Sequence, residues 1–473
     1  MPMKKSAAFA FAAASIFALV AAGCGPSATD PEGGDDDVTG GNKDGGTMMP
    51  PYTGPVGTLE GTVWAPGNAP GQVPAGHEIP VAGALVYLTT TMPPPIPQEV
   101  YCDKCANPPG AKYVLANEKG VFKMEGILPG TYWVAIQKGQ FRFDQRIEVP
   151  ANQTVAMTSA QTTLPSEQDP ANGKWIPRIA LASGNYDKMQ DIFGKMGLGT
   201  VNASGTFTSG SQGMKFDVYK NGGIIDSSGA MTFANLVSDL TKMRQYHIIF
   251  VPCASDMNTA SLQMDTVRAN IKEYVKQGGK FYVTDWSAEW EDTVFPEYIQ
   301  FDGSSVDTAP GAAPSAFGDG DGIDSYESYH AKAENVQLNK WMMGQTGPTL
   351  TATGGLFGGV GPGPVAAFNA DDFVVEGNWD RIVATPRQQI GTDMDNLPVY
   401  SEAHAFVVGD WGEDTGARNH PLTVTFEPAG CGRVLYSTYH TAESTHVGLL
   451  PQERVLLYLI MEIGVCKTGP VID

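Results

Sequence analysis

The sequence is poor in basic residues. Its 473 residues include 30 Lys and Arg against 51 Asp and Glu, which gives a formal net charge of −21 at pH 7. A protein that binds nucleic acid or an anionic membrane surface concentrates positive charge, because the phosphates it contacts are negative. The charge balance therefore argues against both kinds of partner. It favours solubility outside the cell and leaves divalent cations open as partners.

The sequence also lacks an apolar run long enough to cross a bilayer as a helix, which takes about 20 residues. Its longest run, residues 7–20, follows two lysines and has the length of a signal-peptide core. The segment Ala21-Ala22-Gly23-Cys24 comes next and resembles the lipobox of bacterial lipoproteins, which implies cleavage before Cys24 and a diacylglyceryl thioether on that cysteine. An ordinary secretory signal followed by a chance cysteine is the alternative.

We therefore expect residues 1–23 to be a lipoprotein signal peptide. The mature chain would be anchored in the bacterial cell envelope, at the outer membrane, by the acyl chains on Cys24. Residues 24–55 are rich in Gly and Asp and carry almost no apolar side chains, so they cannot bury a core. We expect a disordered acidic tether that spans roughly 30 Å.

Short strand-like runs separated by Pro, Gly and Asn fill residues 56–150. They are residues 59–64, 84–88, 112–115, 120–124, 131–136 and 145–149. This spacing predicts a small antiparallel β-sandwich. The order of Gly61-Thr-Val, Val81-Ala-Gly-Ala-Leu-Val-Tyr-Leu, Asn117-Glu-Lys-Gly-Val-Phe and Ile127-Leu-Pro-Gly-Thr-Tyr resembles the carboxypeptidase regulatory-like, transthyretin-like domain. The resemblance implies a non-catalytic sandwich of secreted and surface proteins, here with an insertion at residues 92–110.

Only five cysteines remain after the lipidation candidate. Cys102 and Cys105 lie in the insertion and can close on each other across a short loop; a redox pair and a metal site are the alternatives. Cys431 and Cys466 could form a second disulfide that fixes the last helix, although spacing alone does not establish connectivity. Cys253 would then be the odd thiol.

From residue 175 onward the pattern changes, after a polar connector at residues 151–174. Apolar runs typical of buried strands alternate with runs at helical spacing. The strands are expected at 178–182, 216–219, 247–251 and 281–284, and the helices at 189–196, 233–240 and 267–275. This alternation predicts an α/β domain with a parallel sheet, which we place at residues 175–466.

The end of this region resembles a known family. The segments Pro421-Leu-Thr-Val-Thr-Phe426 and Gly432-Arg-Val-Leu-Tyr-Ser-Thr-Tyr-His440, with a helix at 452–463, are similar to the carboxyl-terminal part of ThuA-like proteins, in the class I glutamine amidotransferase-like superfamily. Together with residues 246–286, the resemblance spans about 175–302 and 370–466. It implies a flavodoxin-like α/β fold, so the whole chain is expected to be multidomain, with a β-sandwich before the parallel sheet.

The superfamily's nucleophile elbow, Gly-x-Cys-x-Gly, is missing. The strand in the corresponding place is followed by Asp285-Trp286-Ser287, and Cys253 follows the preceding strand. His440 and Glu443 lie where the superfamily has its histidine and acidic partner. A cysteine–histidine hydrolase stays open, beside the simpler interpretation that the cysteine is a buried thiol. The missing elbow favours a non-catalytic protein.

Polar and aromatic side chains follow several of the expected strands. Ligands bind at the carboxyl ends of the strands in open parallel sheets. Carboxylates and indole rings together suit sugar recognition, although they occur equally in packed loops. The candidate cleft residues are Cys253, Asp256, Asp285, Trp286, Glu289, His440 and Glu443.

Residues 303–369 form an insertion rich in Gly, Ala and Pro, which could cover the cleft at Asp285. Within it Asp319, Asp321 and Asp324 are weak candidates for a calcium site. The acidic register of such loops fails, because Phe317 stands at the first acidic position. An ordinary acidic turn is the alternative.

Taken together, these patterns predict a lipid-anchored envelope protein. The sandwich would be a spacer, and the α/β domain would bind a carbohydrate or an envelope protein. No nucleic-acid partner is expected, and no cofactor apart from the calcium candidate. The alternative is a hydrolase of the amidotransferase-like superfamily with a degenerate active site.

Overall fold

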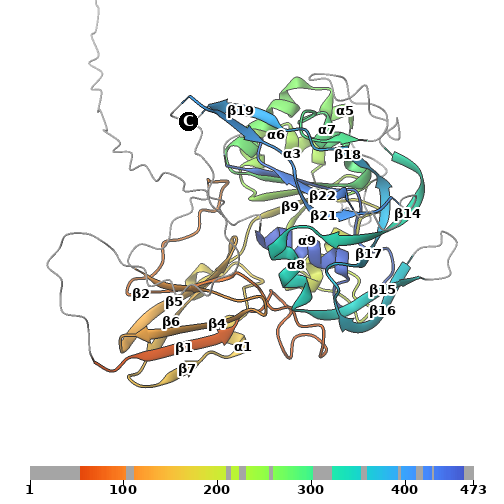
Figure 1. Cartoon of the computed structure of the whole chain (residues 1–473). Coiled ribbons are helices and arrows are strands. Elements are labelled where there is room, and N and C mark those ends of the chain that lie inside the picture. Colours follow the sequence, from red (N-terminus) through yellow and green to blue (C-terminus); the bar gives the residue numbers. More distant parts are fainter. Residues whose placement is uncertain are drawn as a thin grey trace, which may run out of the picture. The chain divides into compact units, whose positions relative to one another are not determined.

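The computed structural model describes most of the chain after the predicted tether. The described residues are 54–102, 111–208, 215–222, 231–254, 259–301, 322–352, 360–392, 396–411, 419–428 and 431–462. Gly54 and the residues after it belong to one compact unit (Figure 1). The predicted signal peptide, Cys24 and nearly all of the predicted tether lie outside the described residues. Within these residues, no helix is both long and apolar enough to cross a membrane.

Two sheets, seen as two layers in Figure 1, form the amino-terminal sandwich. One has the order β4-β1-β7 and the other β3-β2-β5-β6-β8. Their strands are β1 (Gly57–Thr62), β2 (Leu85–Thr89), β3 (Lys112–Leu115), β4 (Val121–Ile127), β5 (Gly130–Lys138), β6 (Phe141–Val149), β7 (Thr154–Ala156) and β8 (Lys174–Trp175). All six strand-like runs of the sequence are strands.

The polar stretch at residues 151–174 is not a free connector. Strand β7 pairs in parallel with β1, and β8 pairs with β6. Two short helices, α1 (Ser159–Thr162) and η1 (Pro170–Asn172), lie between these strands. The polar composition of residues 151–174 suggested a connector because β7 and β8 are short edge strands, and edge strands often carry polar residues.

A mixed sheet of nine strands follows, in the order β10-β9-β11-β12-β23-β22-β21-β14-β17. Its first five strands are parallel to one another. They are β9 (Ile179–Ala182), β10 (Asp217–Tyr219), β11 (Ile248–Val251), β12 (Lys280–Thr284) and β23 (Arg433–Ser437). Strand β9 therefore lies between β10 and β11, and β23 joins the sheet beside β12.

The other four strands extend this sheet in antiparallel fashion. They are β14 (Gly322–Ala333), β17 (Phe373–Asp380), β21 (His404–Gly409) and β22 (His420–Phe426). This half curls back on itself, because Asn378 at the end of β17 forms a β-bridge with Tyr439 beyond β23. The curl brings the far edge strand to the carboxyl ends of the parallel strands.

The predicted insertion at 303–369 supplies part of this framework. Besides β14 it contains α8 (Val336–Met343) and a hairpin of β15 (Thr346–Ala352) and β16 (Val360–Ala367). The described residues of the insertion thus form mainly helix and strands. Gly and Pro are tolerated in β15 and β16 because this two-stranded hairpin lies outside the main sheet.

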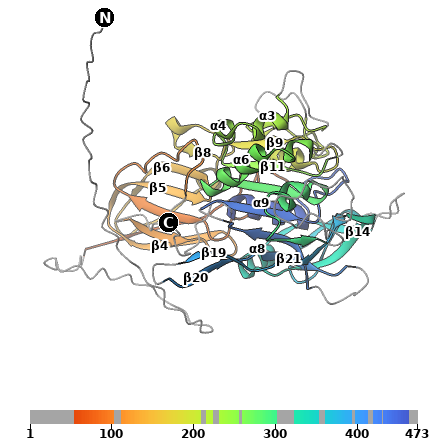
Figure 2. The same ribbon diagram turned by 90° about the horizontal axis from the view of Figure 1, so that it is seen from above.

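Helices cover both faces of the main sheet (Figures 1 and 2). Helices α3 (Phe233–Val237) and α6 (Asp265–Lys276) lie on one face, and α8 and α9 (Pro451–Glu462) on the other. The remaining elements are α2 (Met189–Phe193), the π-helical turn η2 (Gly194–Leu198), α4 (Leu240–Met243), α5 (Thr259–Leu262), η3 (Asp285–Ser287), α7 (Glu289–Asp292), β13 (Gln300–Phe301), β18 (Ile382–Ala384), β19 (Gln388–Thr392) and β20 (Pro398–Ser401).

Alternation along the parallel strands supplies two hydrophobic cores. In β9, Ile179 and Leu181 belong to one core and Ala180 and Ala182 to the other, because successive side chains of a strand point to opposite faces. The core that contains Ile179 continues into the sandwich. The indole nitrogen of Trp341 on α8 donates a hydrogen bond of 2.7 Å to the carbonyl of Pro80 within this continuous region.

One disulfide joins Cys102 to Cys431, across 329 residues of sequence. The expected local bond between Cys102 and Cys105, and a bond between Cys431 and Cys466, are therefore wrong. Cys105 and Cys466 lie outside the described residues. The bond links the insertion of the sandwich to the turn that precedes β23.

Candidate functional site

Three neighbouring strands of the parallel half bring a thiol, a carboxylate and an imidazole together. Cys253 follows β11, Asp285 follows β12, and His440 follows β23. All three are buried, with relative exposures of 1%, 0% and 3%. One ligand atom from each lies within 4.8 Å of the others. The structure thus brings these three predicted cleft residues together at one edge of the sheet.

Asp285 occupies a sharp turn from strand to helix. Its φ of 48° is left-handed, a region that residues other than glycine seldom adopt. Its Oδ1 accepts a hydrogen bond of 3.1 Å from the backbone N–H of Trp379. Its buried Oδ2 has no hydrogen-bond partner among the described residues. Burial raises the pKa of this carboxyl well above its ordinary value, and the nearby charge of Asp187 raises it further.

His440 is held with one ring nitrogen facing Asp285. Its Nδ1 lies 2.9 Å from the carbonyl oxygen of Thr441, so Nδ1 carries the hydrogen and donates it. Its Nε2 lies 3.6 Å from Asp285 Oδ2. Gly377, at φ 77°, packs on the ring, where a Cβ would come within 2.8 Å of the imidazole. The absence of a side chain at Gly377 thus allows this close approach.

Cys253 is almost fully buried, with a relative exposure of 1%. Its backbone N–H donates a hydrogen bond of 2.9 Å to Oγ1 of Thr284. Burial raises the pKa of the thiol well above its ordinary value, and the carboxylates of Asp285 and Asp187 raise it further. A nucleophilic cysteine needs the opposite surroundings, because the thiolate is the reactive form.

Asp187 is a central residue of the site that the sequence reasoning missed. Its Oδ2 accepts a hydrogen bond of 2.7 Å from Thr284 Oγ1, and its Oδ1 one of 3.2 Å from the backbone N–H of Thr441. Its own N–H donates to the carbonyl of Cys253 at 3.3 Å. Burial raises the pKa of Asp187, and the charge of His440 opposes that rise. Asp187 therefore fastens the ends of four parallel strands to one another.

A pocket of about 450 Å³ opens beside this cluster. It is lined by Asn185, Tyr186, Lys188, Cys253, Trp286, Trp379, His440 and Glu443. The rings of Tyr186 and Trp286 meet edge to face with their centroids 5.7 Å apart. The rings of Trp286 and Trp379 are tilted by 54° with their centroids 4.9 Å apart. The pocket thus combines aromatic rings with amide, ammonium and carboxylate groups.

Most of the predicted cleft residues meet at this pocket. Cys253, Trp286, His440 and Glu443 line it, and Asp285 contacts His440 behind them. Glu289 is buried on α7, accepts a hydrogen bond from Thr293, and is not among the lining residues.

Asp256, Asp319 and Asp321 lie outside the described residues. The backbone of Asp324 lies in β14, while its side chain is not described.

Four lining residues were missed. Asn185, Tyr186 and Lys188 follow β9, so the strand-end rule that selected Trp286 would have found them. Trp379 is the next-to-last residue of β17, and it reaches the pocket only because the antiparallel half of the sheet curls back. No local pattern predicts that return.

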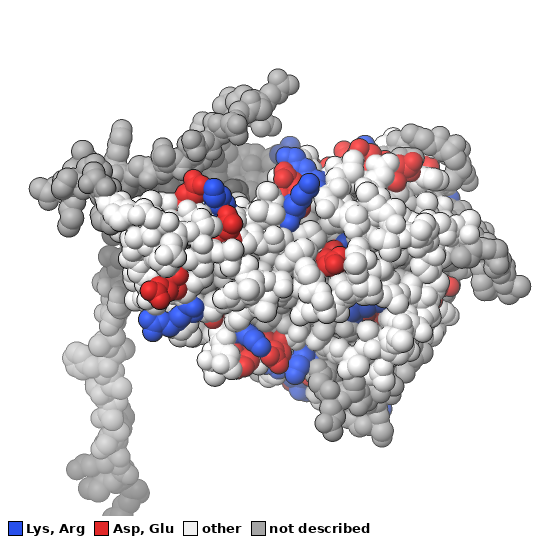
Figure 3. Space-filling view, turned by 90° about the horizontal axis from the view of Figure 1, so that it is seen from below, with Lys and Arg blue, Asp and Glu red and all other residues white. Residues whose placement is uncertain are grey.

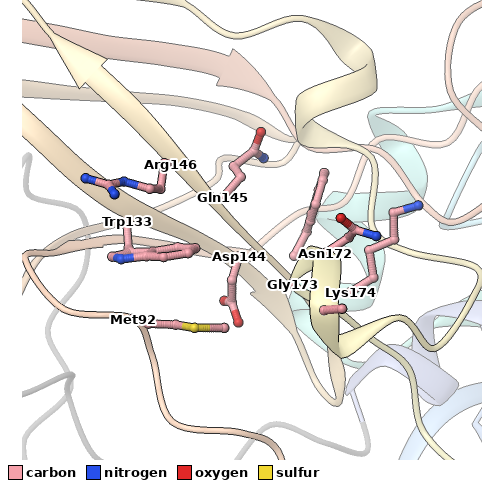
Figure 4. A pocket seen from close by; sticks show the side chains of 10 residues that line it. Met92, Trp133, Asp144, Gln145, Arg146, Asn172, Gly173 and Lys174 are labelled. Atoms are coloured by element: carbon pink, nitrogen blue, oxygen red, sulfur yellow. The ribbon is translucent and has the colours of Figure 1, made fainter.

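A second hollow, of about 430 Å³, lies on the sandwich (Figure 4). Trp133, Asp144 and Arg146 line it, and the Arg146 guanidinium lies 5.9 Å from the Trp133 ring. The Asp144 carboxylate accepts hydrogen bonds of 2.9 Å from both Arg142 and the Trp175 indole. This carboxylate therefore serves to hold β6 and β8 together.

The face in Figure 3 carries charges of both signs, singly or in small groups, among wide uncharged areas. This face has no concentrated basic patch of the kind that binds nucleic acid.

Comparison with known proteins gives only distant likenesses. No family model and no curated protein matches the sequence. Solved structures of ThuA-like proteins are among the structural neighbours. One from Parabacteroides merdae is 13% identical over 63% of this chain and 91% of its own, with a TM-score of 0.26. One from Bacteroides uniformis is 11% identical over 62% and 94%, with a TM-score of 0.31.

A minor pilin of Streptococcus agalactiae is 16% identical over 25% of this chain, with a TM-score of 0.17. The chain spans about half of that pilin's length (47%). With TM-scores this low, none of these proteins indicates an activity for this chain.

Proposed function

We propose that this protein is a lipid-anchored binding protein of the bacterial cell envelope, and that its α/β part binds a small carbohydrate in the pocket beside Trp286. The observation that carries the proposal is the lining of the pocket. Indole and phenol rings offer apolar faces to a sugar ring, and Asn185, Lys188 and Glu443 offer donors and acceptors to its hydroxyls.

The position of the pocket supports the same proposal. It lies at the carboxyl ends of β9, β11, β12 and β23, where ligands bind in open α/β sheets. Numbered along the chain, the five parallel strands have the order 2-1-3-4-5. This is the flavodoxin-like order, which supports the fold that the ThuA-like resemblance implies.

A hydrolase is the second candidate, and one observation favours it. Asp285 turns from strand to helix at a positive φ, as the nucleophile of an α/β hydrolase elbow does. His440 lies 3.6 Å from its carboxylate. An aspartate would then stand where the superfamily has its cysteine, so Cys253 would not be the nucleophile.

The binding proposal is tested by thermal melting of the mature chain carrying Cys24→Ser, against a panel of mono- and oligosaccharides. A ligand that binds only the native state raises Tm with concentration. We expect such a shift, and we expect Trp286→Ala or Trp379→Ala to abolish it. Trp133→Ala, on the sandwich, is the matched control and should leave it intact. A panel without any shift, or a shift insensitive to both pocket variants, would refute carbohydrate binding here. Hydrolysis of a sugar that raises Tm would favour the hydrolase.

The anchor is tested separately by fractionating cells that express the full chain. We expect the wild-type protein in the outer membrane and Cys24→Ser in a soluble fraction. A Cys24→Ser protein that stays in the membrane would refute lipidation as the anchor.

A further inference from the structure

We propose that Cys253, Asp285 and His440 form a binding site for a divalent transition-metal ion of the zinc class, at the buried side of the pocket. This inference goes beyond carbohydrate binding and does not depend on it. The donor set is one thiol sulfur, one carboxylate oxygen and one imidazole nitrogen, all within 4.8 Å of one another. Zinc is bound by these three donor types, whereas magnesium and calcium prefer oxygen alone.

The spacing of the donors suits a shared ion better than a direct hydrogen bond. His440 Nε2 and Asp285 Oδ2 are 3.6 Å apart, which exceeds the usual N–H···O range of about 2.7–3.2 Å. Two ligands at zinc bond lengths of about 2.0–2.2 Å in tetrahedral geometry are separated by roughly 3.3–3.6 Å. The observed separation of 3.6 Å fits the distance between two ligand atoms of a tetrahedral zinc site.

With the Asp285 carboxyl ionised and the His440 ring neutral, the two facing atoms are both acceptors. Since Nδ1 of His440 donates to the Thr441 carbonyl, Nε2 of the neutral ring presents a lone pair toward Asp285. Metal-binding histidines commonly use a backbone carbonyl in this way to fix the ring and its tautomer. Asp285 Oδ2 is fully buried and has no hydrogen-bond partner among the described residues. A cation between the two atoms would satisfy both.

The surroundings hold the three donors in place and give the ionised form of Asp285 no Lys or Arg partner among the described residues. Gly377 packs on the His440 ring, and the backbone N–H groups of Trp379 and Cys253 fix the positions of Asp285 and β11. Within the described residues, neither Asp285 nor the neighbouring Asp187 forms an ion pair with Lys or Arg. A divalent ion would supply that charge and would favour the thiolate of Cys253.

The proposed site is accessible to the pocket. Cys253 and His440 both line it, so a molecule in the pocket can reach an ion bound to them. Three protein ligands leave a fourth position, the arrangement of zinc sites that bind a water molecule or a substrate.

Cobalt is the probe for this site, because Co²⁺ replaces Zn²⁺ and its thiolate charge-transfer band reports a Co–S bond. The protein is the mature chain with Cys24→Ser, Cys105→Ser and Cys466→Ser, stripped with a chelator. With the Cys102–Cys431 bond intact, Cys253 is then the one free thiol. We expect one Co²⁺ per chain, with the thiolate band, and its displacement by Zn²⁺.

Variants assign the ligands. Cys253→Ser should abolish the band, and His440→Gln and Asp285→Asn should each weaken binding by more than the roughly 10–100-fold that loss of an outer partner of a metal ligand costs. His330→Gln, at an exposed histidine on β14, is the matched control and should bind as the parent does. Binding that survives all three site variants, or that is absent from the parent, would overturn the inference.

A second measurement covers variants that fail to fold. X-ray absorption on the zinc-loaded parent protein should show one sulfur and otherwise nitrogen or oxygen ligands; a site without sulfur would overturn the inference. The stripped protein is also tested against the sugar panel. Metal binding without any sugar-induced rise in Tm would leave this inference standing and refute the carbohydrate proposal. A sugar-induced rise in Tm without metal binding would refute this inference and leave the carbohydrate proposal standing.

Discussion

Glu453, on the first turn of α9, is a fully buried carboxylate between two basic side chains. Its Oε2 lies 2.7 Å from His446 Nε2 and 3.8 Å from Lys195 Nζ, and it accepts a hydrogen bond of 3.0 Å from the backbone N–H of Leu450. Burial alone would raise the pKa of Glu453. The charges of Lys195 and His446 outweigh burial and lower it from 4.5 to about 2.

A lowered carboxyl pKa stabilises the fold at pH values above the unfolded pKa. That stability is lost as the pH falls from about 4.5 toward 2. At about 1.4 kcal/mol per pKa unit, the ionised form contributes about 3 kcal/mol at pH 6 and about 1 kcal/mol at pH 3. His446 has the opposite sign, because its raised pKa gives stability that is lost as the pH rises through that value. It remains charged at both pH 3 and pH 6.

The perturbation is Glu453→Gln, which keeps the shape and removes the charge. We expect urea unfolding at pH 6 to show a loss of about 3 kcal/mol, in line with the cost of breaking a buried ion pair. At pH 3 the loss should be smaller by about 2 kcal/mol, because protonation of Glu453 has already removed part of its contribution to the stability of the wild-type protein. Glu148→Gln, at an exposed position on β6, is the control. A loss that is the same at both pH values would refute the electrostatic reasoning.

Three further predictions rest on single contacts. Replacing Cys102 and Cys431 by Ser should lower the free energy of unfolding by about 2–4 kcal/mol, because a long loop is no longer closed in the unfolded chain; equal urea midpoints with and without the bond would contradict this. Gly377→Ala should cost about 1–2 kcal/mol for its left-handed backbone and should displace the His440 ring, measured by urea unfolding and by the chemical shifts of that ring; an unchanged ring would contradict it. Trp341→Phe should cost about 1–3 kcal/mol, since a buried carbonyl of the sandwich loses its donor; an unchanged melting curve would exclude that contribution.

The parts of the fold that could be predicted were those where local pattern decides structure. The buried strands 247–251 and 281–284 and the helix between them correspond closely to β11, β12 and α6. Cys253, Asp285 and His440 were found because each follows a buried parallel strand, and such ends meet at one edge of a sheet.

The rest depended on contacts between distant segments. Trp379 reaches the pocket through the return of β17, which is set by the curl of the sheet and by no residue near it in sequence. The partner of Cys102 is 329 residues away in the sequence. Cys105 is only three residues away, so a local bond was the simpler prediction. Asp187 looks like an ordinary loop residue until its two hydrogen-bonded oxygens are seen.

The disulfide between Cys102 and Cys431 has a consequence for biogenesis. If the chain is exported from its amino terminus, as proposed, Cys102 and Cys105 reach the oxidising compartment long before Cys431. In that interval Cys105 is the nearest oxidation partner, and a bond made then must be exchanged later by attack of another thiolate. Maturation of this protein would therefore depend on a disulfide isomerase, and cells without one should accumulate a form in which the two early cysteines are joined.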